Sequence, residues 1–279
     1  MKYIEIKASA KINIGLFITS KRADGYHNLN TLFYPVEELS DILTFEPSDK
    51  FEFSCTDESL LSDKTNLVVK AVRLLEKMHG GKINVRVNLI KNIPKQAGLG
   101  GGSSDAAATL ISLNEMFGFG FNFDQLVDLG LQLGSDVPFF IKSKPAIGKS
   151  RGEHLEFVDL EIKQPILIVN PHINISTKEA FQNIKPKEVD FDLKSAVLNG
   201  GLDFHFLRKN VINNFEPFVF SKYEEIRKLK EDMYINGAEF ALMSGSGSTV
   251  YGIFQDIESA EKMKDLLPRD YYSVINYNN

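Results

Sequence analysis

The sequence predicts an α+β protein of two domains, and three observations support this fold class. Alternating apolar residues, typical of strands, and apolar residues three or four positions apart, typical of helices, occur in both halves of the 279 residues. The chain has no internal repeat and no low-complexity run. A new apolar strand pattern opens at Pro165, which places a boundary near residue 160. We therefore expect domains at 1–160 and 161–279.

In the first domain, the pattern alternates between strands and helices. Val85, Val87 and Leu89 alternate with polar residues, as in a strand that leads to a glycine-rich loop. Thr65 is expected to cap a helix that Gly80 ends, and Asn122 to cap one that Gly134 ends. The expected strands are 2–18, 32–36, 41–47 and 85–89, with a turn near 21–25, and the expected helices are 67–78, 104–117 and 124–133.

In the second domain, the apolar run Pro165–Asn170 predicts a strand. Ser176 and Glu179 have the spacing of a capping box and predict a short helix, and the polar stretch 185–201 predicts a loop. The remaining expected helices are 207–218, 223–236 and 257–266, and the remaining strands are 248–254 and 271–277.

Composition narrows the class of protein. A net charge of −5 argues against a nucleic-acid-binding protein, which usually has a basic face. The single cysteine, Cys55, forms no internal disulfide and fits a reducing compartment. The first seven residues mix charged and apolar side chains, unlike a signal peptide, and no apolar run is long enough to cross a membrane. We therefore expect a cytoplasmic protein with no nucleic-acid or membrane partner.

The most informative segment is the glycine-rich stretch from Pro94 to Ala107, PKQAGLGGGSSDAA. Four glycines within five residues precede a strongly helical sequence, so main-chain amides and the helix dipole favour an anion, most often a phosphate. A flexible linker is the alternative, and the helix that follows directly argues against it. The dinucleotide-binding fingerprint G-x-G-x-x-G, started at Gly98, would need a glycine at position 103, which is a serine. A Walker A loop that ends in Gly148-Lys149-Ser150 would need a glycine at position 143, which is also a serine.

This segment resembles the second signature of the GHMP kinases, P-x-x-x-G-L-G-(G)-S-S-x-(A). Further segments that resemble the superfamily are Ala10–Leu16, Arg22–Leu29, Leu133–Phe140 and Met243–Thr249. The resemblance therefore covers nearly the whole chain. It implies a ribosomal-protein-S5-like N-terminal domain, a ferredoxin-like C-terminal domain, and a small-molecule kinase that uses ATP and Mg²⁺.

Two residues are expected to be catalytic. Asp136 precedes the apolar segment Val137–Phe140, and from the residues alone it is equally a partly desolvated base or a helix-end aspartate bound to local amides. Lys11 and Asn13 share one strand face with Gly15, which is either a solvent face or a ligand wall. The resemblance implies that Asp136 and Lys11 are catalytic and that Asn13 binds the substrate.

The resemblance also implies a set of nucleotide-binding residues. Ser103 and Ser104 add hydroxyls that can reach phosphate oxygens or Mg²⁺, whereas Asp105 is interpreted as a charge that favours the helix dipole. The scattered histidines and lone Cys55 predict no metal site made by protein side chains. The full cofactor-binding set is Asn66, Leu67, Lys91, Pro94, Lys95, Gln96, Ala97, Gly98, Leu99, Gly100, Gly101, Gly102, Ser103 and Ser104.

The turn that contains Tyr26 and His27 suits an unpaired nucleobase, because the tyrosine can stack on it and the histidine can bond its edge. A structural or solvated histidine is the alternative. The resemblance assigns this turn, with Thr177, Phe181 and Gly245, to the substrate, although core packing would also explain Phe181. It implies a cytidine diphosphate derivative of methylerythritol as acceptor. We expect the protein to be a monomer or weak homodimer. A kinase of the homoserine or mevalonate type and an inactive relative stay open.

Overall fold

The structure, a computed structural model, describes residues 3–63 and 65–277. The chain forms two compact units that interleave along the sequence. Unit 1 comprises the residues up to Ala10, Leu39–Lys95 and Gly100–Ser143, and unit 2 comprises Lys11–Glu38, Gln96–Leu99 and the residues from Lys144 onward. These units differ from the expected halves 1–160 and 161–279, so that sequence boundary stays a prediction. Each unit is described by itself.

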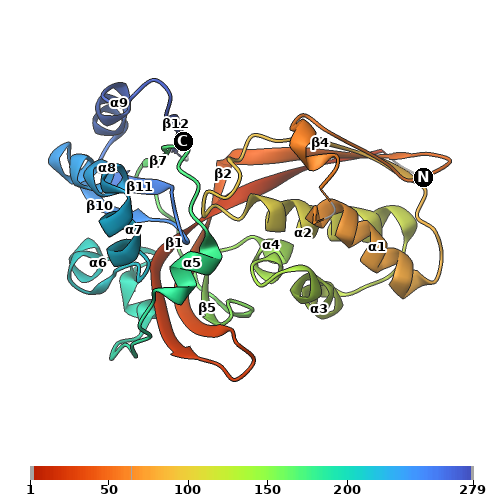
Figure 1. The fold of residues 1–279 in the computed structure, drawn as a ribbon, viewed down its shortest axis with the longest axis horizontal. Helices are drawn as coiled ribbons and strands as arrows, with labels where there is room; N and C mark the ends of the chain where they lie inside the picture. Colours follow the sequence, from red (N-terminus) through yellow and green to blue (C-terminus); the bar gives the residue numbers. More distant parts are fainter. Residues whose placement is uncertain (1–2, 64, 278–279) are drawn as a thin grey trace. The chain divides into compact units, whose positions relative to one another are not determined.

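Unit 1 combines a small part of a sheet with a group of helices (Figure 1). Strand β3 is parallel to β4, and β4 is antiparallel to the end of β2, with Ile42 opposite Ile90. The helices pack on one another, α1 against α2 and α2 against α3 and α4. The elements wholly inside unit 1 are β3 (Glu52–Cys55), η1 (Glu58–Leu60), α1 (Leu67–His79), β4 (Val85–Ile90), α2 (Gly101–Phe117), α3 (Phe123–Leu133) and α4 (Val137–Lys142).

The helices of unit 1 begin and end where local chemistry dictates. Asn66, and not Thr65, caps α1: its side chain accepts a hydrogen bond from the amide of Val68, while Thr65 bonds to Asp63. Gly80 ends α1 in the left-handed region, as expected from the sequence. Asn122 forms a capping box with Gln125 at the start of α3, which confirms the predicted cap. Helix α2 begins at Gly101, three residues before the predicted start.

Unit 2 contains an antiparallel sheet in the strand order β10-β11-β7-β12. Along the chain, the strands and the helices packed on them run β7, α8, β10, β11, α9, β12, which is the ferredoxin-like arrangement that the resemblance implied. The bounds are β7 (Ile166–Asn170), α8 (Glu224–Ile235), β10 (Ala238–Met243), β11 (Val250–Phe254), α9 (Ile257–Asp265) and β12 (Tyr272–Asn276). Buried apolar side chains of this sheet and its helices form one core with Phe215 and Val219.

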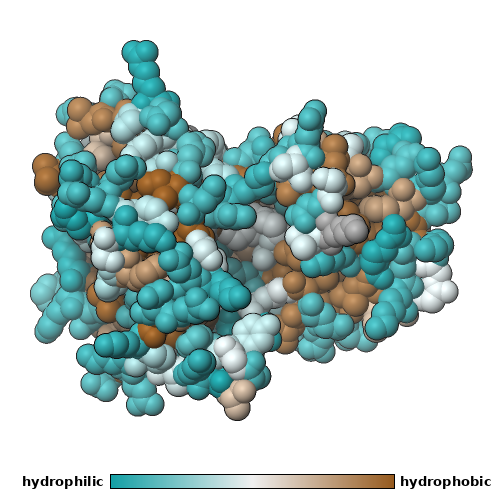
Figure 2. All heavy atoms as spheres, in the orientation of Figure 1, coloured by the Kyte–Doolittle hydropathy of each residue, from teal (hydrophilic) through white to brown (hydrophobic). Residues whose placement is uncertain are grey.

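Unit 2 also contains strands and helices outside this sheet. Strands β1 (Ile4–Lys21) and β2 (His27–Pro47) contribute residues to both units, and β5 pairs with Leu29–Phe33 of β2. The remaining elements are β5 (Ala146–Ser150), β6 (His154–Phe157), α5 (Thr177–Gln182), η2 (Leu193–Ala196), β8 (Val197–Leu198), β9 (Gly201–Leu202), α6 (Phe204–Asn210) and α7 (Glu216–Lys222). On the face drawn in Figure 2, mainly hydrophilic residues cover α5, whereas hydrophobic residues gather over α3 and α4 of unit 1.

The predicted helix 207–218 is wrong, because tertiary contacts divide it into α6 and α7. Residues 212–214 instead pair with β1 of unit 2: Leu16 donates to the carbonyl of Ile212 and accepts from the amide of Asn214. The Asn213 amide group donates to the carbonyls of Met243 and Gly245, and its side-chain oxygen accepts from Phe215. These bonds replace the helical ones, so the helical periodicity misled the prediction.

Several other expectations were corrected in detail. The separate strands 32–36 and 41–47 are one strand, β2, and the loop 185–201 contains η2 and β8. The first expected strand, 2–18, is confirmed as β1 over the described residues, and residue 2 lies outside them. Strands β3, β5, β6 and β10 and helix α4 were not predicted, since they are short or lie in segments without clear periodicity.

Candidate active site

Lys11 lies on β1 in unit 2 and is 3% exposed. Its ammonium group donates hydrogen bonds to the side-chain oxygen of Asn13 at 2.6 Å and to the carbonyl oxygen of Gly98 at 3.0 Å. The Lys11 amide also donates to the carbonyl of Leu99. A buried cation is costly without such partners. The predicted ligand wall and the glycine loop are therefore in direct contact, and the alternative of a solvent face for Lys11 is wrong.

Asn13 connects Lys11 to the loop after β10. Its side-chain oxygen accepts from Lys11 and from the amide of Gly245 at 3.1 Å, and its amide group donates to the hydroxyl of Thr31. Thr31 in turn donates to the carbonyl of Gly15. Every polar atom of this buried side chain is thus bound, so Asn13 is held in one orientation. Thr31 was not predicted, and a lone threonine in a strand gives no sequence signal for such a role.

The first part of the glycine loop packs directly on the loop after β10. The hydroxyl of Ser244 donates to the carbonyl of Gly98 at 3.0 Å. Gly98 has φ +75, and a Cβ there would overlap the carbonyl oxygen of Ser244. A Cβ at Gly245 would lie 2.8 Å from the Cα of Gly98. Glycine is therefore required at both positions by backbone conformation and by space.

The second part of the glycine loop enters α2. Gly100 is in the left-handed region with φ 74, and its carbonyl accepts from the amide of Ser104. The first amides of α2 have no partner within the helix, so this end offers donors and a positive partial charge to an anion. The buried side chains of Ala97 and Leu99 anchor the loop in unit 2. This geometry fits the predicted phosphate loop.

Asp136 lies in unit 1, in the turn between α3 and α4. It stands at the N-cap of α4, yet its side chain forms no capping hydrogen bond. The turn lies beside the start of α2, because a Cβ at Gly134 would lie 3.9 Å from the hydroxyl oxygen of Ser103. Within unit 1, the predicted base and the phosphate end of α2 are thus brought together by the packing of α4 on α2.

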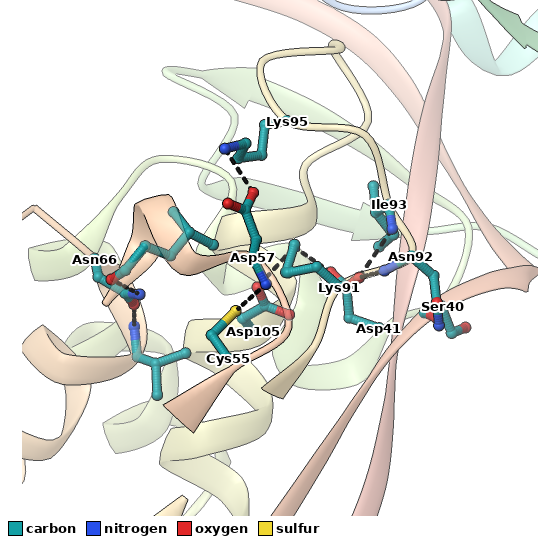
Figure 3. Close-up of polar contacts among 12 residues, drawn as sticks. Ser40, Asp41, Cys55, Asp57, Asn66, Lys91, Asn92, Ile93, Lys95 and Asp105 are labelled. Carbon is teal, nitrogen blue, oxygen red and sulfur yellow. Dashed lines mark hydrogen bonds and ion pairs between the residues drawn. The ribbon is translucent and has the colours of Figure 1, made fainter. Parts of the chain in front are cut away.

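The remaining nucleotide-binding candidates of unit 1 lie around the strand end that precedes the loop (Figure 3). The Asn66 side chain caps α1 and donates to the carbonyl of Leu60. A Cβ at Gly102 would lie 3.9 Å from the side chain of Leu67, so α2 starts beside Leu67. Lys95 forms an ion pair with Asp57. The ammonium group of Lys91 is buried against Asp41 and Asp105.

The predicted acceptor residues of unit 2 form pairs. The ring of His27 stacks on the ring of Phe181, with centroids 5.1 Å apart and planes 20° apart. The guanidinium of Arg151 lies over the ring of Tyr26, 3.8 Å from its centroid. Thr177 bonds to the hydroxyl of Ser246. Arg151 and Ser246 were not predicted as contacts of these residues.

Burial, and secondarily the charge of Lys21, lowers the pKa of His27, which favours the neutral form of its ring. A neutral imidazole has one donor and one acceptor nitrogen, which suits the polar edge of a base. The core-packing alternative for Phe181 is correct in part, since its ring packs edge-on against Phe215 of the core.

The described residues contain no group of three or more His, Cys, Asp or Glu side chains that could hold a metal ion. Mg²⁺ in kinases is held largely by the phosphates of ATP, with one or two protein oxygens. Ser103 at the start of α2 and Asp136 in unit 1 offer such oxygens. The residues present therefore fit a magnesium ion that arrives with the nucleotide.

Models of the N-terminal and the C-terminal domain of one kinase family both match the sequence. The family model described as "GHMP kinases N terminal domain" matches residues 66–144, and the model described as "GHMP kinases C terminal" matches residues 200–273. Together they match more than half of the chain. The chain belongs to the GHMP kinase family, and it is an ATP-dependent small-molecule kinase of α+β fold.

Curated relatives that match most of the chain share the name of one particular kinase. A 4-diphosphocytidyl-2-C-methyl-D-erythritol kinase from Chloroherpeton thalassium is 39% identical over 95% of this chain and 94% of its own. One from Bacteroides thetaiotaomicron is 42% identical over 88% of this chain and 90% of its own. A crystal structure of 4-(cytidine 5'-diphospho)-2C-methyl-D-erythritol kinase matches with a TM-score of 0.81 and 29% identity, covering 99% of this chain and 100% of that one.

More distant structures share the fold alone. The homoserine kinase from Cytophaga hutchinsonii matches with a TM-score of 0.76 and 19% identity over 100% of this chain and 96% of its own.

In the described part of this chain, no helix has both the length and the apolar character that crossing a membrane requires.

Proposed function

We propose that this enzyme phosphorylates the 2-hydroxyl of 4-diphosphocytidyl-2-C-methyl-D-erythritol with ATP, a step in the synthesis of non-mevalonate isoprenoid precursors. Relatives with this activity in their names are about 40% identical over nearly the whole chain. The observation within the structure that supports the acceptor is the pairing of His27 with Phe181 beside Tyr26 in unit 2. Aromatic faces with a polar edge are suited to a cytosine.

The proposed chemistry is a direct transfer. Asp136 takes the proton of the acceptor hydroxyl, and the resulting oxygen attacks the γ-phosphorus of ATP. The bond from the γ-phosphorus to the bridging oxygen breaks, and ADP leaves with that electron pair. The positive charge of Lys11 stabilises the charge on the reacting oxygens. Hydrogen bonds to Asn13 and Gly98 hold that ammonium in place.

Substrates are held by main-chain groups as much as by side chains. The residues Pro94–Ser104 bind the β- and γ-phosphates through amides of the loop and of the first turn of α2. Asn66 and Leu67 lie at the adenine, and Asn13, Thr177 and Gly245 contact the acceptor. Mg²⁺, when bound with ATP, neutralises phosphate charge, and the hydroxyl of Ser103 or Ser104 would supply one of its oxygen ligands.

The proposal is tested by measuring ADP formation with three acceptors: 4-diphosphocytidyl-2-C-methyl-D-erythritol, homoserine and mevalonate. We expect turnover with the cytidyl acceptor to exceed the other two by at least about 100-fold in kcat/KM, because each stacked base contributes roughly 1–3 kcal/mol and the base also forms hydrogen bonds. ATP without any acceptor is the control for background hydrolysis. A preference for homoserine or mevalonate would overturn the proposed acceptor, and no turnover with any of them would favour an inactive relative.

A further inference from the structure

A buried group of three charged residues in unit 1 has no part in the transfer step proposed above. Asp41, Lys91 and Asp105 come from β2, from the residue after β4 and from α2 (Figure 3). Asp41 is fully buried, Asp105 is 3% exposed, and the Lys91 side chain is 8% exposed. The ammonium of Lys91 donates to a carboxylate oxygen of each aspartate, at 2.9 Å for Asp105. We call these three residues the charged triad.

One arm of the charged triad holds the chain that enters the phosphate loop. The second carboxylate oxygen of Asp41 accepts from the amide of Asn92 at 2.6 Å and from the amide of Ile93 at 2.9 Å. Three successive residues are therefore bound to one carboxylate, immediately before the loop starts at Pro94. Carboxylate–amide bonds of this kind are stronger than bonds between neutral groups.

The other arm holds the helix that leaves the phosphate loop. Asp105 is the fifth residue of α2, and Lys91 joins it to Asp41. A Cβ at Gly101 would lie 3.0 Å from the Ile93 side chain and 3.3 Å from the Lys91 ammonium nitrogen. The first turn of α2 thus packs directly on the strand end, with the charged triad fixing their separation.

The charges of the triad argue for a role other than stability. Burial acts to lower the pKa of Lys91, but the charges of Asp105 and Asp41 outweigh it and raise that pKa. Burial raises the pKa of Asp105 to about 8 against the opposing charge of Lys91, and the charge of Asp41 adds to this rise. One oxygen of Asp105 is buried with no hydrogen-bond partner among the described residues. A buried ion pair is often no more stabilising than apolar residues of similar size.

We propose that Asp41, Lys91 and Asp105 are positioning residues that set the two ends of the phosphate loop and thereby the affinity for ATP. Lys91 acts through the two carboxylates rather than as a nucleotide ligand, which revises the role that the resemblance implied. The proposal rests on the proposed function only in requiring ATP to bind the loop, and it is independent of the acceptor.

The test compares two substitutions of the same residue. Asp105→Asn keeps an acceptor oxygen for Lys91, whereas Asp105→Leu removes it and leaves Lys91 in place on Asp41. Affinity for a non-hydrolysable ATP analogue with Mg²⁺ is measured by calorimetry, which needs no acceptor. We expect Asp105→Leu to weaken binding by at least about tenfold, and Asp105→Asn to stay within about threefold of wild type.

Two further variants separate positioning from folding. In Lys91→Met/Asp105→Leu two members of the charged triad are replaced by apolar side chains, while Asp41 keeps its bonds to the amides of Asn92 and Ile93. Thermal unfolding shows whether the domain stays folded. We expect a folded protein with weak ATP binding and an acceptor KM within about threefold of wild type. Arg86→Met is the matched control, since it breaks an exposed ion pair with Glu52 on the same sheet.

The outcomes distinguish the alternatives. Folded Asp105→Leu with wild-type affinity for the analogue would overturn the proposal. Weak binding in Lys91→Met alone, with wild-type binding in Asp105→Leu, would show that Lys91 contacts the nucleotide directly, and this too would overturn it. If wild type binds the analogue but phosphorylates none of the three acceptors, the proposed function fails while the role of the charged triad stands.

Discussion

The ammonium group of Lys11 donates a hydrogen bond to the carbonyl oxygen of Gly98 at 3.0 Å. This bond joins a strand residue to a loop residue 87 positions later in the chain. A cation expected to steady charge on the acceptor is thus fixed to the segment expected to hold the phosphates. Because Ser244 donates to the same carbonyl oxygen, any shift of this loop also disturbs the loop after β10.

Lys11→Met tests the catalytic role of this ammonium. The substitution keeps most of the buried apolar volume and removes the charge, so we expect kcat to fall by about 100-fold or more while the protein stays folded. Lys7→Met is the matched control, because Lys7 lies on the same strand with its side chain exposed. Steady-state kinetics with saturating ATP measures the effect. A kcat within threefold of wild type would remove Lys11 from the chemical step.

Asp136→Asn separates proton transfer from nucleotide binding. The amide cannot accept the hydroxyl proton, so we expect turnover to drop by roughly 10²–10⁴-fold with little change in the affinity for ATP. The Asp136 side chain forms no capping bond to α4, so the substitution removes no helix cap. Asp128→Asn on α3, where the side chain is exposed, is the control. Near-normal turnover in Asp136→Asn would exclude it as the base.

Gly98→Ala tests the close packing of the two loops. The added methyl group meets the backbone of Ser244 and φ is +75, so we expect the free energy of unfolding to fall by more than about 2 kcal/mol and activity to be lost. Gly118→Ala is the matched control: φ is +63 there and nothing lies within 4 Å of a Cβ, so only the backbone penalty of about 1 kcal/mol applies. Urea unfolding compares them. Equal losses for both variants would contradict the packing argument.

Phe181→Leu tests the proposed contact with cytosine. The ring stacks on His27, and loss of one aromatic platform corresponds to roughly 1–3 kcal/mol of binding. We therefore expect KM for the cytidyl acceptor to rise by about five- to 100-fold and KM for ATP to stay unchanged. Phe218→Leu, at a partly buried position against the same core, controls for packing. If both variants change the two KM values alike, Phe181 is a core residue only.

Stability should depend on pH through Asp105. Its pKa in the folded protein, about 8, lies above the ordinary value of 3.8, so the folded protein binds more protons than the unfolded chain between these values. The stabilising contribution of Asp105 to the free energy of unfolding is therefore fully present below pH 4 and is lost as the pH rises through 8. Besides Lys91 and Asp41, the neighbouring titratable group is Cys55, and burial raises the pKa of its thiol.

We expect Asp105→Asn to remove this dependence. From pH 6 to 8, the free energy of unfolding of wild type should fall by about 2 kcal/mol more than that of the variant. Urea titrations at several pH values measure both, with Asp128→Asn as control. A variant with the same pH dependence as wild type would show that Asp105 is ionised in the folded protein at neutral pH.

The sequence alone determined the parts of this protein whose structure depends on near neighbours. The caps Asn122 and Gly80, the strand 85–89 and the glycine-rich entry into α2 are confirmed, because capping, alternation and glycine content act within a few residues. The family could likewise be predicted from short continuous motifs. Contacts between residues far apart in the sequence could not be predicted in this way.

Tertiary structure decided what local patterns could not. Residues 212–214 leave the helical state because β1 offers them backbone partners, and periodicity cannot report a partner nearly 200 positions away. Asp105, interpreted from sequence as a dipole charge, is instead buried against Lys91 and Asp41. A charge's partner and its burial are set by packing between distant segments, so only the folded chain shows which charges face solvent and which are buried against one another.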